Sequence, residues 1–149
     1  MFDIVTVLHI EDSALVRELI SEVMKIKGLI VVPTNSIGTA IDRALNVRFD
    51  LAIIDTELPD GLSFNFLSEI KEAVGADVPI IATSGESDYA KKWQQLIDEG
   101  QVFAFLPKPF SVASLDEMIT LALGLKADEQ TDQCPDCGAW HALTECCQG

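Results

Sequence analysis

The sequence predicts an α/β fold in which a parallel sheet of five strands is covered by helices on both faces. Five short runs rich in β-branched residues recur along the chain, and each is apolar nearly throughout, as in strands buried on both faces. Between and after them, apolar residues recur at three- and four-residue spacing, which is typical of amphipathic helices. Regular alternation of strand and helix implies parallel strands joined by right-handed crossovers.

The five expected strands end where polar residues begin. They are IVTVLHI (4–10), LIVVP (29–33), FDLAIID (49–55), VPIIATS (78–84) and VFAFL (102–106). The expected helices span 13–27, 36–47, 62–74, 87–99 and 111–124. Gly28 and Gly100 end the first and the fourth helix, and Ser111 is a favourable N-cap for the fifth.

The composition is that of a folded, acidic protein. The 149 residues allow one domain of ordinary size and a short appendage, and a hydrophobic content of 48% supports a full core. The net charge of −14 argues against binding to nucleic acid or to anionic membranes. No run approaches the ~20 apolar residues of a membrane span, and the first residues lack the basic region of a signal peptide. We therefore expect a cytoplasmic protein.

A change of composition divides the chain. We expect a globular domain over residues 1–125 and a polar linker over 126–133. A cysteine-rich tail over 134–149 holds all four cysteines. Their absence from the globular part fits a cytosolic domain better than a secreted one held by disulfides.

Polar residues gather at the ends of the expected strands. Glu11 and Asp12 follow the first strand, Asp55 ends the third, and Thr83 and Ser84 end the fourth. Sites in open α/β sheets form outside the carboxyl ends of the strands. We therefore expect these carboxylates and hydroxyls to converge at one edge of the sheet.

The fifth strand stops at FLPKPF, where Lys108 stands between two prolines that cannot continue a sheet ladder. Its ammonium would join three carboxylates, of which any two about 4 Å apart repel by about 4 kcal/mol at an effective dielectric constant of about 20. Such a cluster is tolerable if it holds a hard dication or if some of its members stay protonated. Mg²⁺ suits it best, because it accepts a few carboxylates and keeps waters for a substrate phosphate. A metal, an acceptor oxygen and a cation for the phosphoryl oxygens are what phosphoryl transfer needs.

Residues 4–124 resemble the receiver domain of bacterial two-component response regulators. The resemblance rests on VLHIEDS, LAIIDTELPDG, PIIATSGES and FLPKPF, which occur in this order, each at a strand end. It implies a doubly wound, flavodoxin-like (βα)5 fold with strand order 2-1-3-4-5. It also implies a chemotaxis-regulator-like response regulator in two-component signal transduction or a phosphorelay.

The resemblance implies a role for each matching residue. Asp55 accepts a phosphoryl group from a histidine kinase or a phosphotransfer protein. Asp12 binds Mg²⁺ directly, Glu11 binds it through water, and the backbone carbonyl of Glu57 completes the metal site. Lys108 pairs with a phosphoryl oxygen.

Two further positions follow from the resemblance. The family has a Ser or Thr hydroxyl followed by a small residue at the end of the fourth strand, which favours Ser84, with Thr83 as the competing choice. Phe105 matches the switch aromatic, although it also fits a plain core residue. The bond between Lys108 and Pro109 is expected to be cis, as is usual in the family.

Other positions have structural interpretations. The loop TELPDGLS is shorter than in many family members, so we expect a tight turn into the third helix, and Glu57 adds a fourth carboxyl near the site. His9 lies inside a strand and is expected to be structural. Trp93 lies on the apolar stripe of the fourth helix and is expected in the core, with a partner contact as the alternative.

The tail segment CPDCGAWHALTECC (134–147) resembles one knuckle of a zinc ribbon. One interpretation is a Zn²⁺ site formed by Cys134, Cys137, His141 and either Cys146 or Cys147. Free or redox-active thiols and disulfides are the alternatives.

We therefore expect a phosphoacceptor response regulator, not an enzyme beyond self-catalysed phosphoryl transfer and slow autodephosphorylation. The last 25 residues leave no room for a DNA-binding domain, so output is expected through protein–protein contacts of the fourth helix, fifth strand and fifth helix. A phosphorelay shuttle is a related interpretation.

Two rival functions remain. A metal-dependent phosphatase of similar fold would need a second Asp two residues after the nucleophile, where this chain has Glu57. A non-phosphorylated pseudo-receiver would act as an adaptor through its cysteine-rich, metal-binding tail. The intact set of Glu11, Asp12, Asp55 and Lys108 argues against it.

Overall fold

Five strands form one parallel sheet in the structure, a computed structural model that describes residues 4–85 and 87–124. They are β1 (Thr6–Ile10), β2 (Ile30–Thr34), β3 (Leu51–Asp55), β6 (Ile80–Ser84) and β7 (Ala104–Pro107). Their order is β2-β1-β3-β6-β7, and each neighbouring pair is parallel. The predicted fold class and strand order are confirmed, because β6 and β7 are the fourth and fifth strands of this sheet in chain order.

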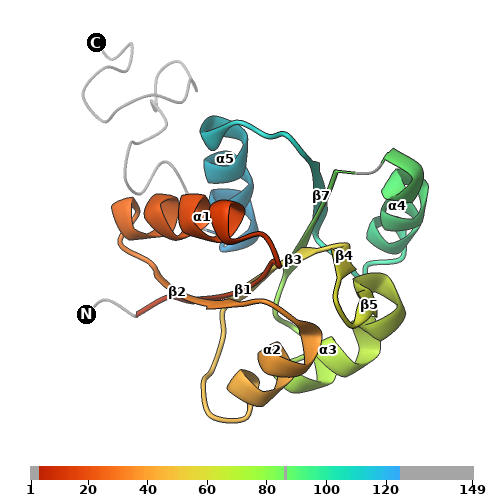
Figure 1. Cartoon of the computed structure of the whole chain (residues 1–149), viewed down its shortest axis with the longest axis horizontal. Helices are drawn as coiled ribbons and strands as arrows, with labels where there is room; N and C mark the ends of the chain where they lie inside the picture. Colours follow the sequence, from red (N-terminus) through yellow and green to blue (C-terminus); the bar gives the residue numbers. More distant parts are fainter. Residues whose placement is uncertain (1–3, 86, 125–149) are drawn as a thin grey trace, which may run out of the picture.

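Helices cover both faces of the sheet (Figure 1). α1 (Ala14–Ile26) and α5 (Val112–Ala122) lie on one face, and α2 (Ile37–Ala44), α3 (Leu67–Val74) and α4 (Ala90–Asp98) lie on the other. α3 and α4 begin later than predicted, because the 3-10 segments η1 (Ser63–Phe66) and η2 (Ser87–Tyr89) precede them. Ser111 caps α5 as expected and accepts a hydrogen bond from Ser114 N at 3.0 Å. Among the described residues, no helix has both the length and the apolar character needed to cross a membrane.

Two apolar cores lie on the two faces of the sheet. Ala52 and Ile54 of β3 belong to the core beneath α2, α3 and α4, whereas Leu51 and Ile53 belong to the core beneath α1 and α5. This division follows from the alternation of side chains along a strand. Trp93 of α4 is fully buried, which confirms that it is a core residue.

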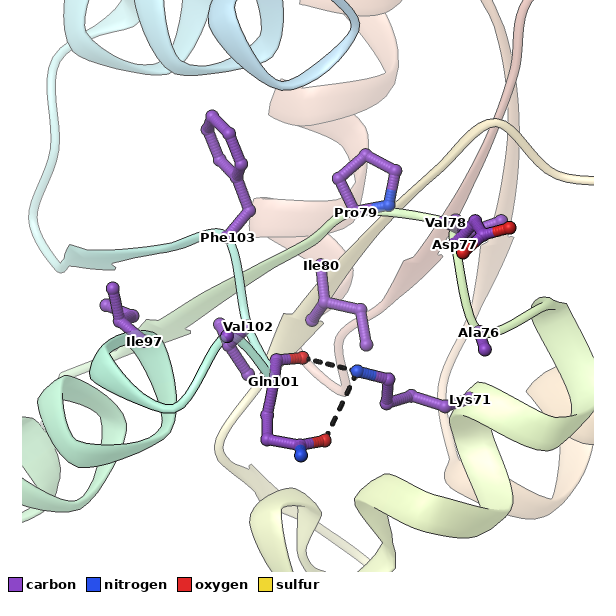
Figure 2. A pocket seen from close by; sticks show the side chains of 11 residues that line it. Lys71, Ala76, Asp77, Val78, Pro79, Ile80, Ile97, Gln101, Val102 and Phe103 are labelled. Carbon is purple, nitrogen blue, oxygen red and sulfur yellow. Dashed lines mark hydrogen bonds between the residues drawn. The ribbon is translucent and has the colours of Figure 1, made fainter.

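The amino edge of the sheet carries a hollow of about 340 Å³ beside β6 and β7 (Figure 2). Lys71 of α3 donates hydrogen bonds to the main-chain oxygen of Gln101 at 2.8 Å and to its Oε1 at 3.3 Å. These bonds join α3 to the segment between α4 and β7. They lie at the edge opposite to the strand end that carries Asp55.

A short antiparallel hairpin follows β3. It consists of β4 (Glu57–Leu58) and β5 (Gly61–Leu62), which are joined by a turn of two residues. A tight turn was predicted here, but the two strands were not, because strands of two residues are too short to show a pattern in the sequence. In the turn, Asp60 accepts hydrogen bonds from Ile37 N at 2.9 Å and Gly38 N at 3.1 Å. These amides belong to the first turn of α2 and have no acceptor within the helix, so the carboxylate connects the hairpin to that helix.

Replacing Asp60 with Ala should lower the free energy of unfolding at pH 7 by about 1 kcal/mol, because two helix-terminal amides lose their acceptor. Some loss of hydration would raise the pKa of this exposed carboxyl, but the hydrogen bonds from Ile37 and Gly38 hold it below the ordinary value of 3.8. The stabilisation is therefore present above pH 4 and lost as the pH falls through the folded-state pKa. Urea unfolding would measure it, with Asp42→Ala on α2 as the control. An equal effect of both substitutions would contradict the prediction.

Candidate functional site

Acidic and basic side chains meet at the carboxyl edge of the sheet. Glu11 and Asp12 follow β1, Asp55 is the last residue of β3, and Lys108 follows β7. Carboxylate oxygens of Glu11, Asp12 and Asp55 lie within 4.8 Å of one another. The structure thus brings together the charged residues that the sequence places at the strand ends.

Lys108 lies between two of the carboxylates. Its Nζ is 2.7 Å from Oε1 of Glu11 and 3.2 Å from Oδ1 of Asp55. Its main-chain N donates to the oxygen of Ser84 at 2.8 Å, so β7 stays paired with β6 up to this residue. The next peptide bond, to Pro109, is cis as predicted. Lys108 is thus the last residue bonded to β6 at this end of β7, and its side chain faces the acidic cluster.

Glu11 is held on several sides. It is 1% exposed, and its Oε2 accepts a hydrogen bond from Ser13 N at 3.1 Å. Its main-chain oxygen accepts from Nη1 of Arg17 at 2.7 Å, and its N donates to the oxygen of Thr34 at 3.0 Å. Buried carboxylates are tolerated only when paired in this way. The side chain of Glu11 is therefore held in one position in the wall of the site, whereas Asp12 is exposed at its mouth.

Asp55 is 6% exposed, and its Oδ1 accepts a hydrogen bond from Thr56 N at 3.0 Å. Burial and the charge of Glu11 raise the pKa of Asp55 to about 6, and Lys108 and the Thr56 amide offset only part of this rise. Burial would lower the pKa of Lys108, but its hydrogen bond to Glu11 and the two carboxylate charges raise it. Lys108 is therefore a cation at neutral pH, and Asp55 is mostly ionised.

The two hydroxyls at the end of β6 are both buried. Thr83 pairs with Asp55 in the sheet register, and Ser84 pairs with Pro107. Glu57 has an exposed side chain, and Phe105 is half-buried against the core that contains Trp93. The choice between Ser84 and Thr83, and the roles of Glu57 and Phe105, stay predictions. The cysteines and His141 lie outside the described residues.

Thr56 is a site residue that the sequence analysis missed. Its amide contacts Asp55, and its hydroxyl donates to the main-chain oxygen of Thr83 at 2.8 Å. Arg17, which supports Glu11, was also missed. Neither residue stands out in the sequence, because the packing of the fold and not a local pattern brings them to their partners. His9 is 1% exposed and burial lowers its pKa to about 3, so it is neutral, as a structural residue would be.

The donor set fits Mg²⁺. Three carboxylates supply hard oxygen ligands, and one ammonium leaves the cluster with excess negative charge. The raised pKa of Asp55 reflects burial first and then repulsion from Glu11, which a dication would relieve. Glu11, Asp12 and Asp55 are the side chains that could hold the ion, and Asp12 leaves it accessible from solvent.

The family model of the response regulator receiver domain matches residues 7–120. This chain belongs to that family. It is 28% identical over 117 residues to the KDP operon transcriptional regulatory protein KdpE of Escherichia coli, in an alignment covering 78% of this chain and 50% of the relative. The chain thus spans about half the length of the curated relatives it matches.

Solved receiver domains share the fold. The chemotaxis response regulator CheY4 of Vibrio cholerae superposes with a TM-score of 0.72 at 24% identity, covering 81% of this chain and 100% of that one. The NtrC4 receiver domain, solved as a beryllofluoride-activated dimer, gives 0.70 at 26% identity and covers 80% and 96%. Membership of the family implies a part in two-component signalling, in which receiver domains interact with histidine kinases or phosphotransfer proteins.

The Asp55→Asn variant should be more stable than the wild type in the absence of metal. The folded-state pKa of Asp55 is about 6, above the ordinary 3.8, so its favourable contribution is present below pH 4 and lost as the pH rises through 6. At pH 7.5 the variant should gain roughly 1–3 kcal/mol in free energy of unfolding.

Urea unfolding with a chelator at pH 7.5 and pH 4.5 would measure the gain, which should shrink at the lower pH. Asp42→Asn removes an exposed carboxylate from α2 and is the control. A variant less stable than the wild type at pH 7.5 would refute this account of the site.

Proposed function

We propose that this chain is a phosphoacceptor response regulator and that Asp55 takes a phosphoryl group from a histidine kinase or a phosphotransfer protein. The observation that carries the proposal is the buried carboxyl of Asp55 beside Glu11, Asp12 and the ammonium of Lys108. Such a site offers an acceptor oxygen, oxygen ligands for a dication and a cation for the incoming phosphoryl oxygens.

In the proposed reaction an oxygen of the Asp55 carboxylate attacks the phosphorus of a phosphohistidine. The new P–O bond forms as the P–N bond breaks, and the imidazole leaves. Thr56 N and Lys108 Nζ both contact Oδ1, so we assign the attack to Oδ2. Mg²⁺ held by Glu11, Asp12, Asp55 and the carbonyl of Glu57 would neutralise charge on the phosphoryl oxygens.

The same side chains then respond to the product. The phosphoryl group brings up to about two negative charges, and the Lys108 ammonium would shift toward it from Glu11. In the proposal the Ser84 hydroxyl also approaches it and Phe105 rotates, which changes the surface of α4, β7 and α5. Such a shift follows only from contacts that differ between the two states.

An apolar surface beside the site fits the donor protein. A hollow of about 420 Å³ is lined by residues of α1 and of the segment after β7, among them Val16, Leu19, Lys108 and Phe110. Leu15 of α1 is 79% exposed and Leu19 is 46% exposed. We assign this surface to the phosphodonor, because a donor that reaches Asp55 must pass the rim that includes Lys108.

Incubation with acetyl phosphate and Mg²⁺ tests the proposal. Intact-mass spectrometry should show a labile gain of one phosphoryl group in the wild type and in Asp42→Asn, and none in Asp55→Asn, which lacks the nucleophile. Failure of the wild type to react under conditions that modify another receiver domain would favour the non-phosphorylated adaptor instead.

Leu15→Glu should slow phosphoryl transfer from a kinase at least roughly tenfold, because a charge replaces an apolar contact at the donor surface. Labelling by acetyl phosphate should stay at the wild-type rate, since that donor needs no docking surface. Purified kinases of the source organism that label the wild type would serve as donors. Ile26→Glu, 84% exposed at the far end of α1, is the matched control. Equal slowing by both substitutions would contradict the assignment.

A further inference from the structure

A buried hydrogen bond joins the residue after Asp55 to helix α4. The indole Nε1 of Trp93 donates to the hydroxyl oxygen of Thr56 at 2.7 Å. The same hydroxyl donates to the main-chain oxygen of Thr83 at 2.8 Å. The Thr56 amide is shared between that oxygen at 2.9 Å and Oδ1 of Asp55 at 3.0 Å. Thr56 and Trp93 are both 0% exposed. A continuous set of hydrogen bonds therefore runs from the carboxyl of Asp55 to the middle of α4.

The indole is also held by its aromatic neighbours. The ring of Phe64 in η1 lies 5.6 Å from that of Trp93 at an interplanar angle of 79°, an edge-to-face arrangement. The ring of Tyr89 lies 5.6 Å from that of Phe64 at an interplanar angle of 59°. The contact with Phe64 therefore packs the indole of α4 against η1. The indole N–H therefore points to one partner, the Thr56 hydroxyl.

The polar contact matters because its surroundings are apolar. Trp93 belongs to the core that contains Ile54, Leu58 and Leu67, where an indole N–H has no water to bind. α4 can shift relative to β3 only if this bond breaks or Thr56 moves with it. The Thr56 amide is hydrogen-bonded to Oδ1 of Asp55. This oxygen would change from a carboxylate oxygen to an acyl oxygen if Oδ2 of Asp55 were phosphorylated.

We propose that Thr56 and Trp93 are a coupling pair: their hydrogen bond holds α4 in its resting position and transmits the chemical state of Asp55 to that helix. This inference rests on the proposed phosphorylation of Asp55. Thr56 and Trp93 are positioning residues, since Trp93 touches no reacting atom and the Thr56 side chain acts through its own amide. The pair is separate from the predicted switch residues Ser84 and Phe105.

The test uses the full chain and beryllofluoride with Mg²⁺, the reagent that activated the NtrC4 receiver domain. Amide hydrogen exchange of residues 90–98 is measured with and without the reagent. In the wild type the exchange of α4 should change on addition. In Trp93→Phe, which keeps a ring but lacks the N–H, α4 should exchange about tenfold faster without the reagent, as expected for the loss of one buried hydrogen bond. Its response to the reagent should fall to less than about a third of the wild-type response.

A second pair of variants isolates the hydroxyl. Thr56→Ser keeps it and should behave as the wild type, whereas Thr56→Val keeps the shape without it and should behave as Trp93→Phe. With Trp140 replaced by Phe, Trp93 is the one remaining tryptophan, and its emission should respond to beryllofluoride in Thr56→Ser but not in Thr56→Val.

Lys71→Met provides the matched control, because it removes the bonds to Gln101 at the far end of α4 (Figure 2) without touching the site. It should keep the full response to beryllofluoride. A wild-type response of α4 in Trp93→Phe or Thr56→Val would overturn the coupling pair. Labelling by acetyl phosphate separates the two proposals. If the wild type and Trp93→Phe are both labelled, Asp55 accepts phosphate and only the coupling pair is in question; if neither is labelled, the proposed function itself fails.

Discussion

The ammonium of Lys108 is the contact on which the carboxyl edge of this sheet depends. It lies within hydrogen-bond distance of Glu11 and close to Asp55, two carboxylates almost fully removed from solvent. Without it, two buried negative charges would face each other with little water to screen them. The main chain fixes the position of this cation, because Lys108 N is bonded to Ser84 on the neighbouring strand.

One ammonium cannot neutralise three carboxylates, so the site carries excess negative charge. The side chain of Glu11 is held in place by hydrogen bonds from Ser13 N and Lys108 Nζ. Burial and, second to it, the repulsion from Glu11 raise the pKa of Asp55 to about 6. Such a site is unfavourable for the stability of the metal-free protein and favourable for binding a cation. Functional sites commonly show this opposition between stability and activity.

Hydrogen bonds connect the segments that follow β1 and β3 to three different helices. Arg17 of α1 holds the main chain of Glu11, and Asp60 in the hairpin after β3 holds the start of α2. Thr56 reaches α4 through Trp93. The first two contacts lie near the surface, where water can replace a lost partner. The third lies in an apolar core, where it cannot, so loss of this bond would leave a buried polar group without a partner.

The sequence by itself determined the sheet, its helices and the four charged residues at the strand ends. Strand and helix periods are local properties, and parallel strands bring their carboxyl ends to one edge whatever the details of packing. The tertiary structure decided the contacts of Thr56, Trp93 and Asp60, and it decided the hairpin at β4 and β5. Thr56 and Trp93 are 37 residues apart, and Asp60 meets amides 22 and 23 residues earlier. Hydrogen bonds over such separations leave no periodic trace, because the partner is chosen by the packing of whole elements and not by neighbouring residues.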